Sequence, residues 1–492
     1  LDFSCALFDG QGRLVANAPH IPVHLGSMGE SVAALLADVA SGQRPPLQPG
    51  DVILSNDPYA GGTHLPDITA ITPVFAACET PAPLFFVASR GHHADVGGIT
   101  PGSMPAFSRT IADEGLLLRN EPFLHQGEFD EENWRERLAA GPHPVRNPDQ
   151  LLADLQAQVA ANHLGAAALQ ELMATEGLEV VQAYMGHVQA NAAAAVRRVV
   201  ERLSDGAHAL ELDNGAWIRV VVQVDRAQGR VRVDFSGTSP QLDTNLNAPL
   251  AVTKAVVLYV FRCLVGEAIP LNAGCFEPIT LVVPPGCLLN PKPPAAVVAG
   301  NVETSQAAAN ALFAALGVQA AAQGTMNNLS FGDAAEGPAS RQYYETICGG
   351  TGAGVLADGN GFAGASAVQS HMTNSRLTDP EILEERFPVQ LERFGRRRGS
   401  GGAGRWHGGD GVVRQWRALE PLTVCLLSSS RRVPPFGLAG GAPGACGVNR
   451  LLRADGSEEW LPSCCELQLQ PGEGLRIETP GGGGYGMTPT AP

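Results

Sequence analysis

The amino-acid sequence predicts a mixed α+β protein made of several packed subdomains with mixed sheets. Three observations lead to this prediction: apolar runs alternate with Gly- and Pro-rich turns towards both ends, a long Ala-rich stretch has helical spacing, and the chain has 492 residues. A chain of this length is too long for one ordinary hydrophobic core, so it has room to bury a shaped active site.

Residues 1–146 are expected to form the first subdomain, of the α/β type. The apolar pattern predicts a hairpin, one helix and three strands, in this order at residues 1–16, 27–39, 51–55, 68–76 and 83–89. Two patches rich in His and Asp adjoin the last two strands, which are expected to run parallel. Rigid strand ends of this kind often present functional side chains.

Three further subdomains are expected along the rest of the chain. Residues 147–205 are Ala-rich and poor in Gly, which predicts a central helical hairpin that breaks near 176–177. Residues 206–378 mix strand and helix patterns with Gly-rich loops and predict an α/β middle subdomain. Residues 379–492 alternate short strands with Gly/Pro turns and predict a β-rich C-terminal part.

The composition excludes several classes of function. The chain is 44% apolar, and no apolar run is long enough to cross a bilayer, so we expect a soluble protein without a membrane partner. The net charge of −16 and the lack of a basic face argue against a nucleic-acid partner. The ten cysteines include no C-x-x-C pair and no secretion signal precedes them, which indicates reduced thiols in the cytoplasm.

The first His/Asp patch holds His64 and Asp67 in an H-x-x-D spacing, within a segment that Pro58 and Pro66 keep from being helical. In a turn, this spacing can aim an imidazole and a carboxylate at one point. The second patch supplies His92, His93 and Asp95 at a strand end. Mixed nitrogen and oxygen ligands suit Mn²⁺, Zn²⁺ or Fe²⁺ better than Ca²⁺ or Mg²⁺, so a divalent metal site is predicted.

Other interpretations of these and neighbouring residues remain open. Asp and His are common in loops, where they hydrogen-bond their own backbone instead of a metal. His20 and His24 either line the same cleft or cap the following helix, and packing is the favoured role. Cys348 without a partner base is interpreted as a buried turn cysteine and not as a nucleophile.

Two absences limit the chemistry that this sequence supports alone. Neither Lys254 nor Lys292 follows G-x-x-x-x-G, so the sequence contains no P-loop, and it contains no G-x-S-x-G motif of a serine hydrolase. The chain also opens at Leu1 inside an expected strand, without an initiator Met. We therefore expect a missing upstream piece, either removed or part of a longer polypeptide.

Several strings along the whole chain carry a resemblance to a known family. The main ones are DFSC at 2–5, ANAPHIPVHLG at 16–26, GGTHLPD at 61–67, SRGHHADVGG at 89–98, GNVETSQ at 300–306, HMTN at 371–374 and TPGGGGYG at 479–486. These strings resemble the hydantoinase B/oxoprolinase family. Residues 344–350 and 378–384 most resemble the C-terminal half of ATP-dependent 5-oxoprolinases.

The resemblance implies a division of labour between two halves. A hydantoinase A-type ATPase, either a separate subunit or a fused N-terminal domain, uses ATP to phosphorylate a small cyclic amide, and the B-type half carries the metal and completes ring opening. For 5-oxo-L-proline the product is L-glutamate. A hetero-oligomer with the ATPase half is therefore expected.

The resemblance also assigns site residues. The family's metal ligands fall on Asp2, His64, Asp67 and His92, with His93 and Asp95 beside them as acid/base candidates. Asp9 competes with Asp2 as the carboxylate ligand. The motif around His371 matches the family, but the resemblance assigns it no role, and backbone N–H groups of residues 349–354 are candidates for holding an oxyanion.

Three alternatives to a 5-oxoprolinase remain at this stage. The chain resembles the B subunit of N-methylhydantoinase-type enzymes and of other cyclic-amide hydrolases, and it also resembles a subunit of acetone carboxylase. An alternative of a different class is a non-catalytic scaffold that shapes the site of an ATPase partner.

Overall fold

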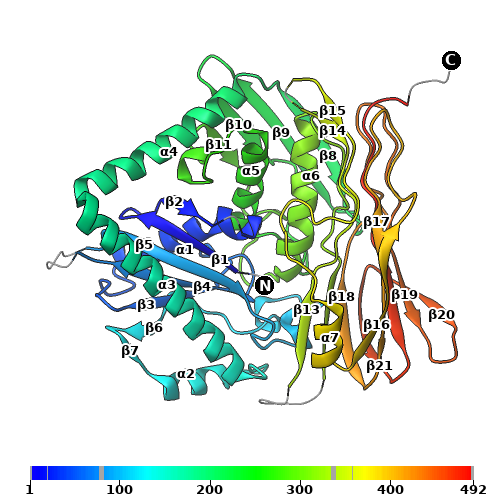
Figure 1. The fold of residues 1–492 in the computed structure, drawn as a ribbon, viewed down its shortest axis with the longest axis horizontal. Helices are drawn as coiled ribbons and strands as arrows, with labels where there is room; N and C mark the ends of the chain where they lie inside the picture. The colour runs from blue at the N-terminus through cyan, green and yellow to red at the C-terminus, as the bar shows by residue number, and fades with distance from the viewer. Residues whose placement is uncertain (1–2, 19, 77–81, 334–339, 357, 489–492) are drawn as a thin grey trace.

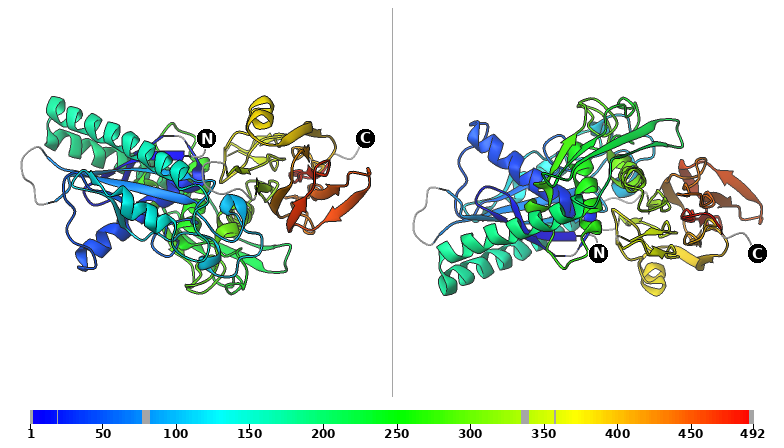
Figure 2. Two further views of the ribbon diagram at one scale, coloured as in Figure 1. Left: turned by 90° about the horizontal axis from the view of Figure 1, so that it is seen from below. Right: turned by 90° about the horizontal axis from the view of Figure 1, so that it is seen from above.

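The computed structural model describes residues 3–18, 20–76, 82–333, 340–356 and 358–488, and it confirms the predicted mixed α+β architecture (Figure 1). Within these ranges the strands form sheets of seven, four, four and five strands and one two-stranded ribbon. A helical hairpin lies at one end of the molecule, and a β-rich C-terminal part lies at the other (Figure 2).

The first sheet has the strand order β2-β1-β5-β4-β3-β6-β7, and all neighbouring strands are antiparallel. The prediction that the strands beside the His/Asp patches run parallel is therefore wrong. Parallel neighbours need a crossover connection of about a dozen residues or more, whereas only ten residues separate the end of β4 from the start of β5. The strands are Phe3–Asp9 (β1), Leu14–Asn17 (β2), Val52–Ser55 (β3), Asp67–Val74 (β4), Phe85–His92 (β5), Glu121–His125 (β6) and Glu128–Phe129 (β7).

Helices cover both faces of the first sheet. Side chains alternate along a strand, so Ile53 and Ile71 pack on the side of α1, whereas Leu54 and Ala70 pack on the side of α3. The α-helices run over Pro22–Ala40 (α1), Glu131–Leu138 (α2), Pro148–Glu176 (α3), Leu178–Val200 (α4), Leu250–Leu264 (α5), Ser305–Ala315 (α6) and Pro380–Arg386 (α7).

Helices α3 and α4 form a hairpin inside the segment 147–205. The side-chain oxygen of Asn147 accepts a hydrogen bond of 3.2 Å from the backbone N–H of Gln150, which caps the first helix. The chain turns at Gly177, whose φ of +87° is readily available only to glycine. The break that was predicted near 176–177 is located there.

The second sheet lies across a helical layer from the first. It is mixed, because β10 and β11 run parallel while the other neighbours are antiparallel. Helices α1, α5 and α6 fill the space between the two sheets, and α1 approaches α5 so closely that a Cβ on Gly26 would lie 2.4 Å from the Cα of Ala255. The strands are Gly206–Glu211 (β8), Trp217–Asp225 (β9), Arg230–Asp234 (β10) and Ile279–Val282 (β11).

Two antiparallel sheets pack face to face in the C-terminal part. Phe331 and Tyr343 of one sheet share a core with Trp416 and Leu475 of the other. The first sheet contains Asn328–Gly332 (β12), Gln342–Glu345 (β13), Leu422–Leu427 (β18) and Cys464–Leu469 (β21). The second contains Val389–Arg397 (β16), Gly411–Ala418 (β17), Val448–Leu452 (β19), Glu458–Leu461 (β20) and Gly474–Glu478 (β22), and the ribbon pairs Gly354–Val355 (β14) with Gly361–Phe362 (β15).

Gly-rich segments beside this sandwich pack as extended chains. Their backbones hydrogen-bond to one another, as from Gly402 N to Gly482 O at 2.9 Å and from Gly484 N to Ala442 O at 2.9 Å. A Cβ on Gly482 would lie 1.9 Å from the carbonyl oxygen of Thr351. Only glycine fits such close backbone contacts, as at the axis of a collagen triple helix.

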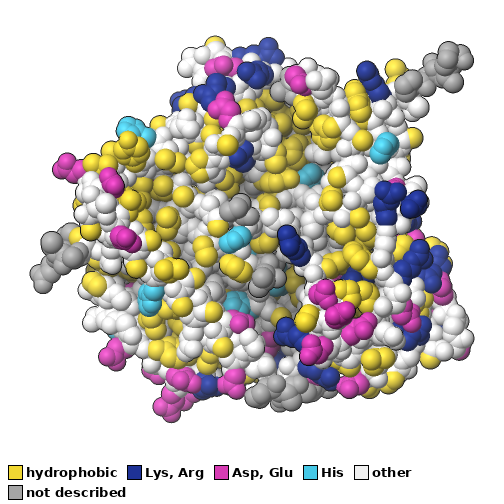
Figure 3. Space-filling view, viewed as in Figure 1, with side chains coloured by type: hydrophobic (Ala, Val, Ile, Leu, Met, Phe, Trp, Pro, Cys, Tyr) yellow, Lys and Arg dark blue, Asp and Glu magenta, His cyan; other side chains and the backbone are white. Residues whose placement is uncertain are grey.

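Oppositely charged side chains lie near one another on part of the surface. On the face seen in Figure 3, acidic and basic side chains are intermixed and gather over the C-terminal sandwich, where Glu458 pairs with Arg450 and Arg476.

No helix in the described ranges combines the length and the apolar character that a membrane span requires.

Gly482→Ala is expected to lower the free energy of unfolding by about 3 kcal/mol, because its methyl group would overlap a carbonyl oxygen that belongs to a fixed backbone. Gly395→Ala is the matched control, since no atom lies within 4 Å of a Cβ at that position, and it should change stability by less than about 0.5 kcal/mol. Urea denaturation measures both. Equal effects of the two substitutions would contradict the close packing of these segments.

Candidate metal centre

The register of β4 and β5 brings Asp67 and His92 together. Asp67 opens β4, His92 ends β5, and the two residues are direct partners across the antiparallel pair. His64 precedes β4 by one tight turn, in which the backbone N–H of Asp67 donates to the carbonyl of His64 at 3.1 Å. The H-x-x-D spacing and the strand pairing thus place three side chains at one edge of the first sheet.

The three side chains meet at one oxygen of the Asp67 carboxylate. His64 Nε2 lies 2.9 Å from Asp67 Oδ1, and His92 Nδ1 lies 3.1 Å from the same oxygen. One nitrogen or oxygen atom from each of the three residues lies within 4.8 Å of the other two. Asp67 and His64 are fully buried, so the cluster is a closed group of potential ligands.

This donor set fits a divalent transition metal. His64 Nε2 and His92 Nδ1 each lie about 3 Å from Asp67 Oδ1, so the three residues could hold one ion with the mixed nitrogen and oxygen ligands that such a metal prefers. The other ring nitrogen of His64, Nδ1, lies 3.4 Å from the carbonyl oxygen of Val298. That contact favours the tautomer in which Nε2 carries the free lone pair.

The surroundings favour the protonation states that bind metals. Burial alone would raise the pKa of Asp67, but the neighbouring His64 and His24 hold it well below its ordinary value. Burial lowers the pKa of His64, against the opposing effect of Asp67. An ionised carboxylate beside a neutral imidazole is the form that ligates a metal ion.

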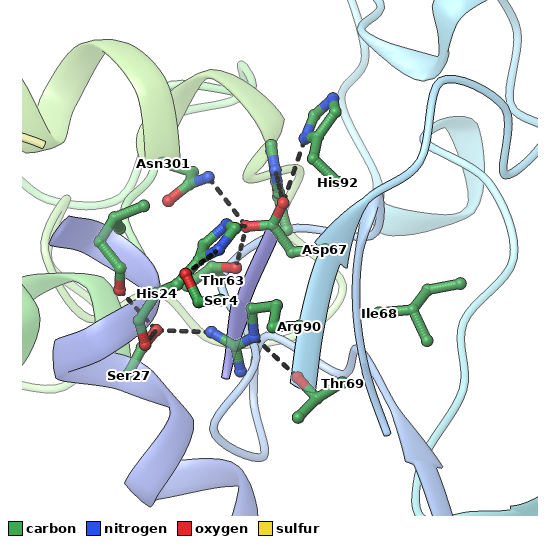
Figure 4. Close-up of polar contacts among 12 residues, drawn as sticks. Ser4, His24, Ser27, Thr63, Asp67, Ile68, Thr69, Arg90, His92 and Asn301 are labelled. Atoms are coloured by element: carbon green, nitrogen blue, oxygen red, sulfur yellow. Dashed lines mark hydrogen bonds and ion pairs between the residues drawn. The ribbon is translucent and has the colours of Figure 1, made fainter. Parts of the chain in front are cut away.

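Four residues around this cluster were not predicted as part of it. The second oxygen of Asp67, Oδ2, accepts hydrogen bonds from Thr63 Oγ1 at 2.6 Å and from Asn301 Nδ2 at 3.3 Å (Figure 4). His24 Nε2 lies 3.3 Å from that oxygen. Tyr344 stacks on His92 with ring centroids 4.4 Å apart. Only His24 carried a local signal, as one of the two histidines considered as cleft-lining or helix-capping.

The structure does not bring His93 or Asp95 to the cluster. His93 follows the strand end, and its Nε2 lies 3.0 Å from Gln158 Oε1 on α3, at the opposite face of the sheet. The Asp95 carboxylate accepts from the backbone N–H groups of Arg146 at 2.6 Å and Asn147 at 2.8 Å, just before α3. This arrangement therefore does not support the prediction that His93 or Asp95 removes a proton at the metal.

Other candidates from the sequence have different places. Asp2 lies outside the described residues, so the structure says nothing of it as a ligand, and its rival Asp9 binds Arg13 at 2.9 Å in the first hairpin. The backbone N–H groups of residues 350, 351 and 353 donate to other chain segments and are therefore not free to hold an oxyanion. Cys348 is buried, and burial raises the pKa of its thiol to about 11, which disfavours a nucleophile.

His371 anchors one wall of the cavity at the site. Its ring is buried, with Nε2 at 2.8 Å from Asn310 Oδ1 and Nδ1 at 3.4 Å from the hydroxyl of Tyr259. The next two residues, Met372 and Thr373, line the same small cavity as the metal cluster. His371 is therefore a packing residue that positions this wall.

Glu114 supports the segment that carries Val298, whose carbonyl oxygen faces His64. Its Oε1 accepts from the backbone N–H groups of Val297 and Val298, both at 3.0 Å, and from Ser108 Oγ at 2.9 Å. Burial raises the pKa of Glu114 to about 8, which favours the neutral acid at pH 7. Through Val298, whose carbonyl faces His64, this acid supports the orientation of a metal-cluster residue.

Glu114→Ala is expected to lower the free energy of unfolding by about 1–3 kcal/mol, because two buried N–H groups lose their acceptor. Glu114→Gln should retain most of the stability, since a neutral amide oxygen replaces the oxygen of a neutral acid. Urea unfolding at pH 7 compares the two variants. Equal destabilisation would show that the ionised carboxylate is required.

The whole chain is similar in sequence to known proteins. The chain is 45% identical over 496 residues to a 5-oxoprolinase of Dictyostelium discoideum and 45% identical over 511 residues to 5-oxoprolinase 1 of Arabidopsis thaliana, in each case over 99% of this chain. It spans 38% and 39% of those two proteins, about two fifths of their length.

The fold is also similar to that of a solved structure. The ATP-dependent caprolactamase from Pseudomonas jessenii is 25% identical and superimposes with a TM-score of 0.83, covering 99% of this chain and 85% of that chain. The family model described as Hydantoinase B/oxoprolinase matches residues 1–488. Because the match runs along nearly the entire sequence, the chain belongs to the hydantoinase B/oxoprolinase family.

Proposed function

We propose that this chain is the metal-dependent, hydrolytic part of an ATP-dependent 5-oxoprolinase, which opens the phosphorylated lactam ring of 5-oxo-L-proline to give L-glutamate. The observation that carries the proposal is the buried cluster of His64, Asp67 and His92 in a chain whose relatives are named 5-oxoprolinases. The similarity to a caprolactamase supports the class of substrate, because caprolactam is also a lactam.

The proposed metal is Mn²⁺, Zn²⁺ or Fe²⁺, held by His64, Asp67 and His92. The family resemblance adds Asp2 as a further ligand. When bound, such an ion supplies Lewis acidity, which polarises the reacting carbon–oxygen group and makes water a stronger nucleophile at neutral pH.

The chain's own residues orient these ligands and exclude water. Thr63 and His24 hold Oδ2 of Asp67, which leaves Oδ1 facing the two ligand histidines. The ring of Tyr344 covers one face of His92 and fixes its plane. These contacts preorganise the ligands, so little reorganisation is needed when an ion or substrate binds.

The proposal assigns ATP to a hydantoinase A-type half, either a separate subunit or a fused domain, in a cytoplasmic hetero-oligomer or a longer chain. A lactam resists water because resonance lowers the electrophilicity of its carbonyl, and phosphorylation of the oxygen creates a leaving group. The absence of a P-loop motif from the sequence supports a separate site for ATP. The greater length of the relatives leaves room for such a half.

His64→Ala and His92→Ala are each expected to lower the bound metal from about one ion per chain to less than about 0.2, and to reduce ring opening at least about 100-fold. Elemental analysis of the purified protein measures the metal. His187→Ala, on the exposed side of α4, is the matched surface control. His93→Asn should keep both the metal and ring opening, and a loss of ring opening with full metal content would restore His93 as an acid/base residue.

The assembled enzyme, with its ATPase half, is expected to convert 5-oxo-L-proline and ATP to L-glutamate, ADP and phosphate, with a kcat/KM at least about tenfold above that for hydantoin or caprolactam. Coupled assays of all three cyclic amides measure this preference. If the enzyme prefers hydantoin or caprolactam, the ring-opening role stands but the proposed substrate is wrong. No turnover of any of them by a metal-loaded assembly would favour the scaffold alternative.

A further inference from the structure

One oxygen of the Asp67 carboxylate, Oδ2, is surrounded by hydrogen-bond donors. Thr63 Oγ1 donates to it at 2.6 Å, Asn301 Nδ2 donates at 3.3 Å, and His24 Nε2 lies 3.3 Å away (Figure 4). A carboxylate oxygen offers about two lone pairs. Three donors therefore occupy the lone pairs of Oδ2, and the hydrogen bond from Thr63 is the shortest of the three.

The other oxygen, Oδ1, has different neighbours. His64 Nε2 lies 2.9 Å from it and His92 Nδ1 lies 3.1 Å from it, and both nitrogens are proposed ligand atoms. The two oxygens of one carboxylate thus face two kinds of partner. Oδ1 faces the proposed metal ligands, and Oδ2 faces residues that only donate hydrogen bonds.

The loop that carries Thr63 is tightly packed. A Cβ on Gly62 would lie 2.4 Å from the carbonyl oxygen of Asn56, so the loop folds directly back on its own start. The Asn56 side chain donates to the carbonyl of Leu65 at 2.8 Å and accepts from the backbone N–H of Leu118 at 2.7 Å. Because both ends of the loop are held in this way, the Thr63 hydroxyl has a fixed position beside Asp67.

Ser4 sets the direction of the hydrogen bond from His24. Both side chains are buried, and Ser4 Oγ lies 3.2 Å from His24 Nδ1. Nε2 of the same ring faces the carboxylate of Asp67, so it must carry a proton, because a bare lone pair there would oppose an anion. Nδ1 of a neutral ring then accepts from the Ser4 hydroxyl, and this chain of contacts favours the tautomer that donates to Oδ2.

We propose that Thr63, supported by His24 and Asn301, restricts Asp67 to binding the metal through one oxygen and so reserves a coordination position for water or the reacting group. This inference rests on the proposed function and adds Thr63 to it as a positioning residue. Carboxylates bind metal ions through one oxygen or through both. A catalytic metal site needs an open position, which a second oxygen of Asp67 would fill.

The proposal differs from a purely structural role of Thr63 in its effect on the metal. If Thr63 only held the Asp67 side chain in place, loss of its hydroxyl would loosen a ligand and weaken metal binding. If Thr63 instead keeps Oδ2 away from the ion, loss of the hydroxyl lets Oδ2 turn towards the ion. The metal is then retained, while ring opening slows because an open position is lost.

The test uses Thr63→Val, which replaces the hydroxyl by a methyl group of similar size, in the complete enzyme with its ATPase half. The variant should bind the metal with a dissociation constant within about threefold of the wild-type value and open the ring about 10- to 100-fold more slowly. Calorimetric titration measures the affinity. Crystal structures of the metal-loaded proteins should show one oxygen of Asp67 on the ion in the wild type and both in the variant.

Thr63→Ser keeps the hydroxyl and should restore both wild-type ring opening and one-oxygen binding. Thr253→Val is the matched control, because Thr253 is also buried and its hydroxyl donates to the carbonyl of Leu289 at 2.8 Å on α5. It should change neither property. His24→Phe removes the second donor at similar size and should show the same pattern as Thr63→Val, so the test does not depend on the folding of one variant.

Two results would overturn the proposal. One is metal binding by Thr63→Val that is more than about tenfold weaker while Asp67 still uses one oxygen, which is the result of a purely structural role. The other is binding through both oxygens in the wild type. If the wild-type enzyme binds no metal or opens no ring, the proposed function fails first, whereas a normal wild type with an unchanged Thr63→Val variant refutes only this inference.

Discussion

The structure around the site depends on one fully buried anion, the carboxylate of Asp67. An ionised carboxylate loses much hydration energy inside a protein, so it must be surrounded by donors or positive charge. Here both oxygens are engaged: His64 and His92 approach Oδ1, while Thr63, Asn301 and His24 approach Oδ2. The five partners come from loops, α1, β5 and a π-helical turn, so the position of one oxygen pair constrains residues up to 234 positions away from Asp67 in the sequence.

A second buried charge balances this anion. Arg90 is completely buried on β5, and its guanidinium donates to Ser27 at 2.5 Å, Ser31 at 2.8 Å and Thr69 at 2.7 Å, which are all hydroxyl groups (Figure 4). No carboxylate among the described residues forms an ion pair with it, but Asp67 is near enough to favour its charged form. Because the hydroxyls lie on α1 and β4, the cation fixes the helix against the sheet and keeps His24, on the same helix, close to Asp67.

The sequence predicted the local parts of this arrangement and missed the long-range ones. The H-x-x-D spacing and the His-rich strand end gave five candidates, His64, Asp67, His92, His93 and Asp95, and only the family resemblance separated the first three as ligands. Helical spacing located α3 and α4. Spacing does not reveal strand partners, and for this reason the strands were expected to be parallel and His93 was grouped with His92 although adjacent strand residues face opposite sides. Asn301 and Tyr344 lie in strings that resemble the family, but nothing in those strings marks them as site residues, because a lone Asn or Tyr becomes part of a site only through tertiary packing.

The contacts of Tyr344 show that the site draws on parts of the chain that lie far apart in the sequence. Tyr344 belongs to β13 of the C-terminal sandwich, yet its ring stacks on His92 of the first sheet. Its hydroxyl donates to Asn328 at 2.8 Å, and Asn328 in turn donates to Glu303 at 2.7 Å, in the same π-helical turn as Asn301. The first sheet supplies the ligands, the middle layer supplies Asn301 and the sandwich supplies the cover, so none of the three can form this site alone.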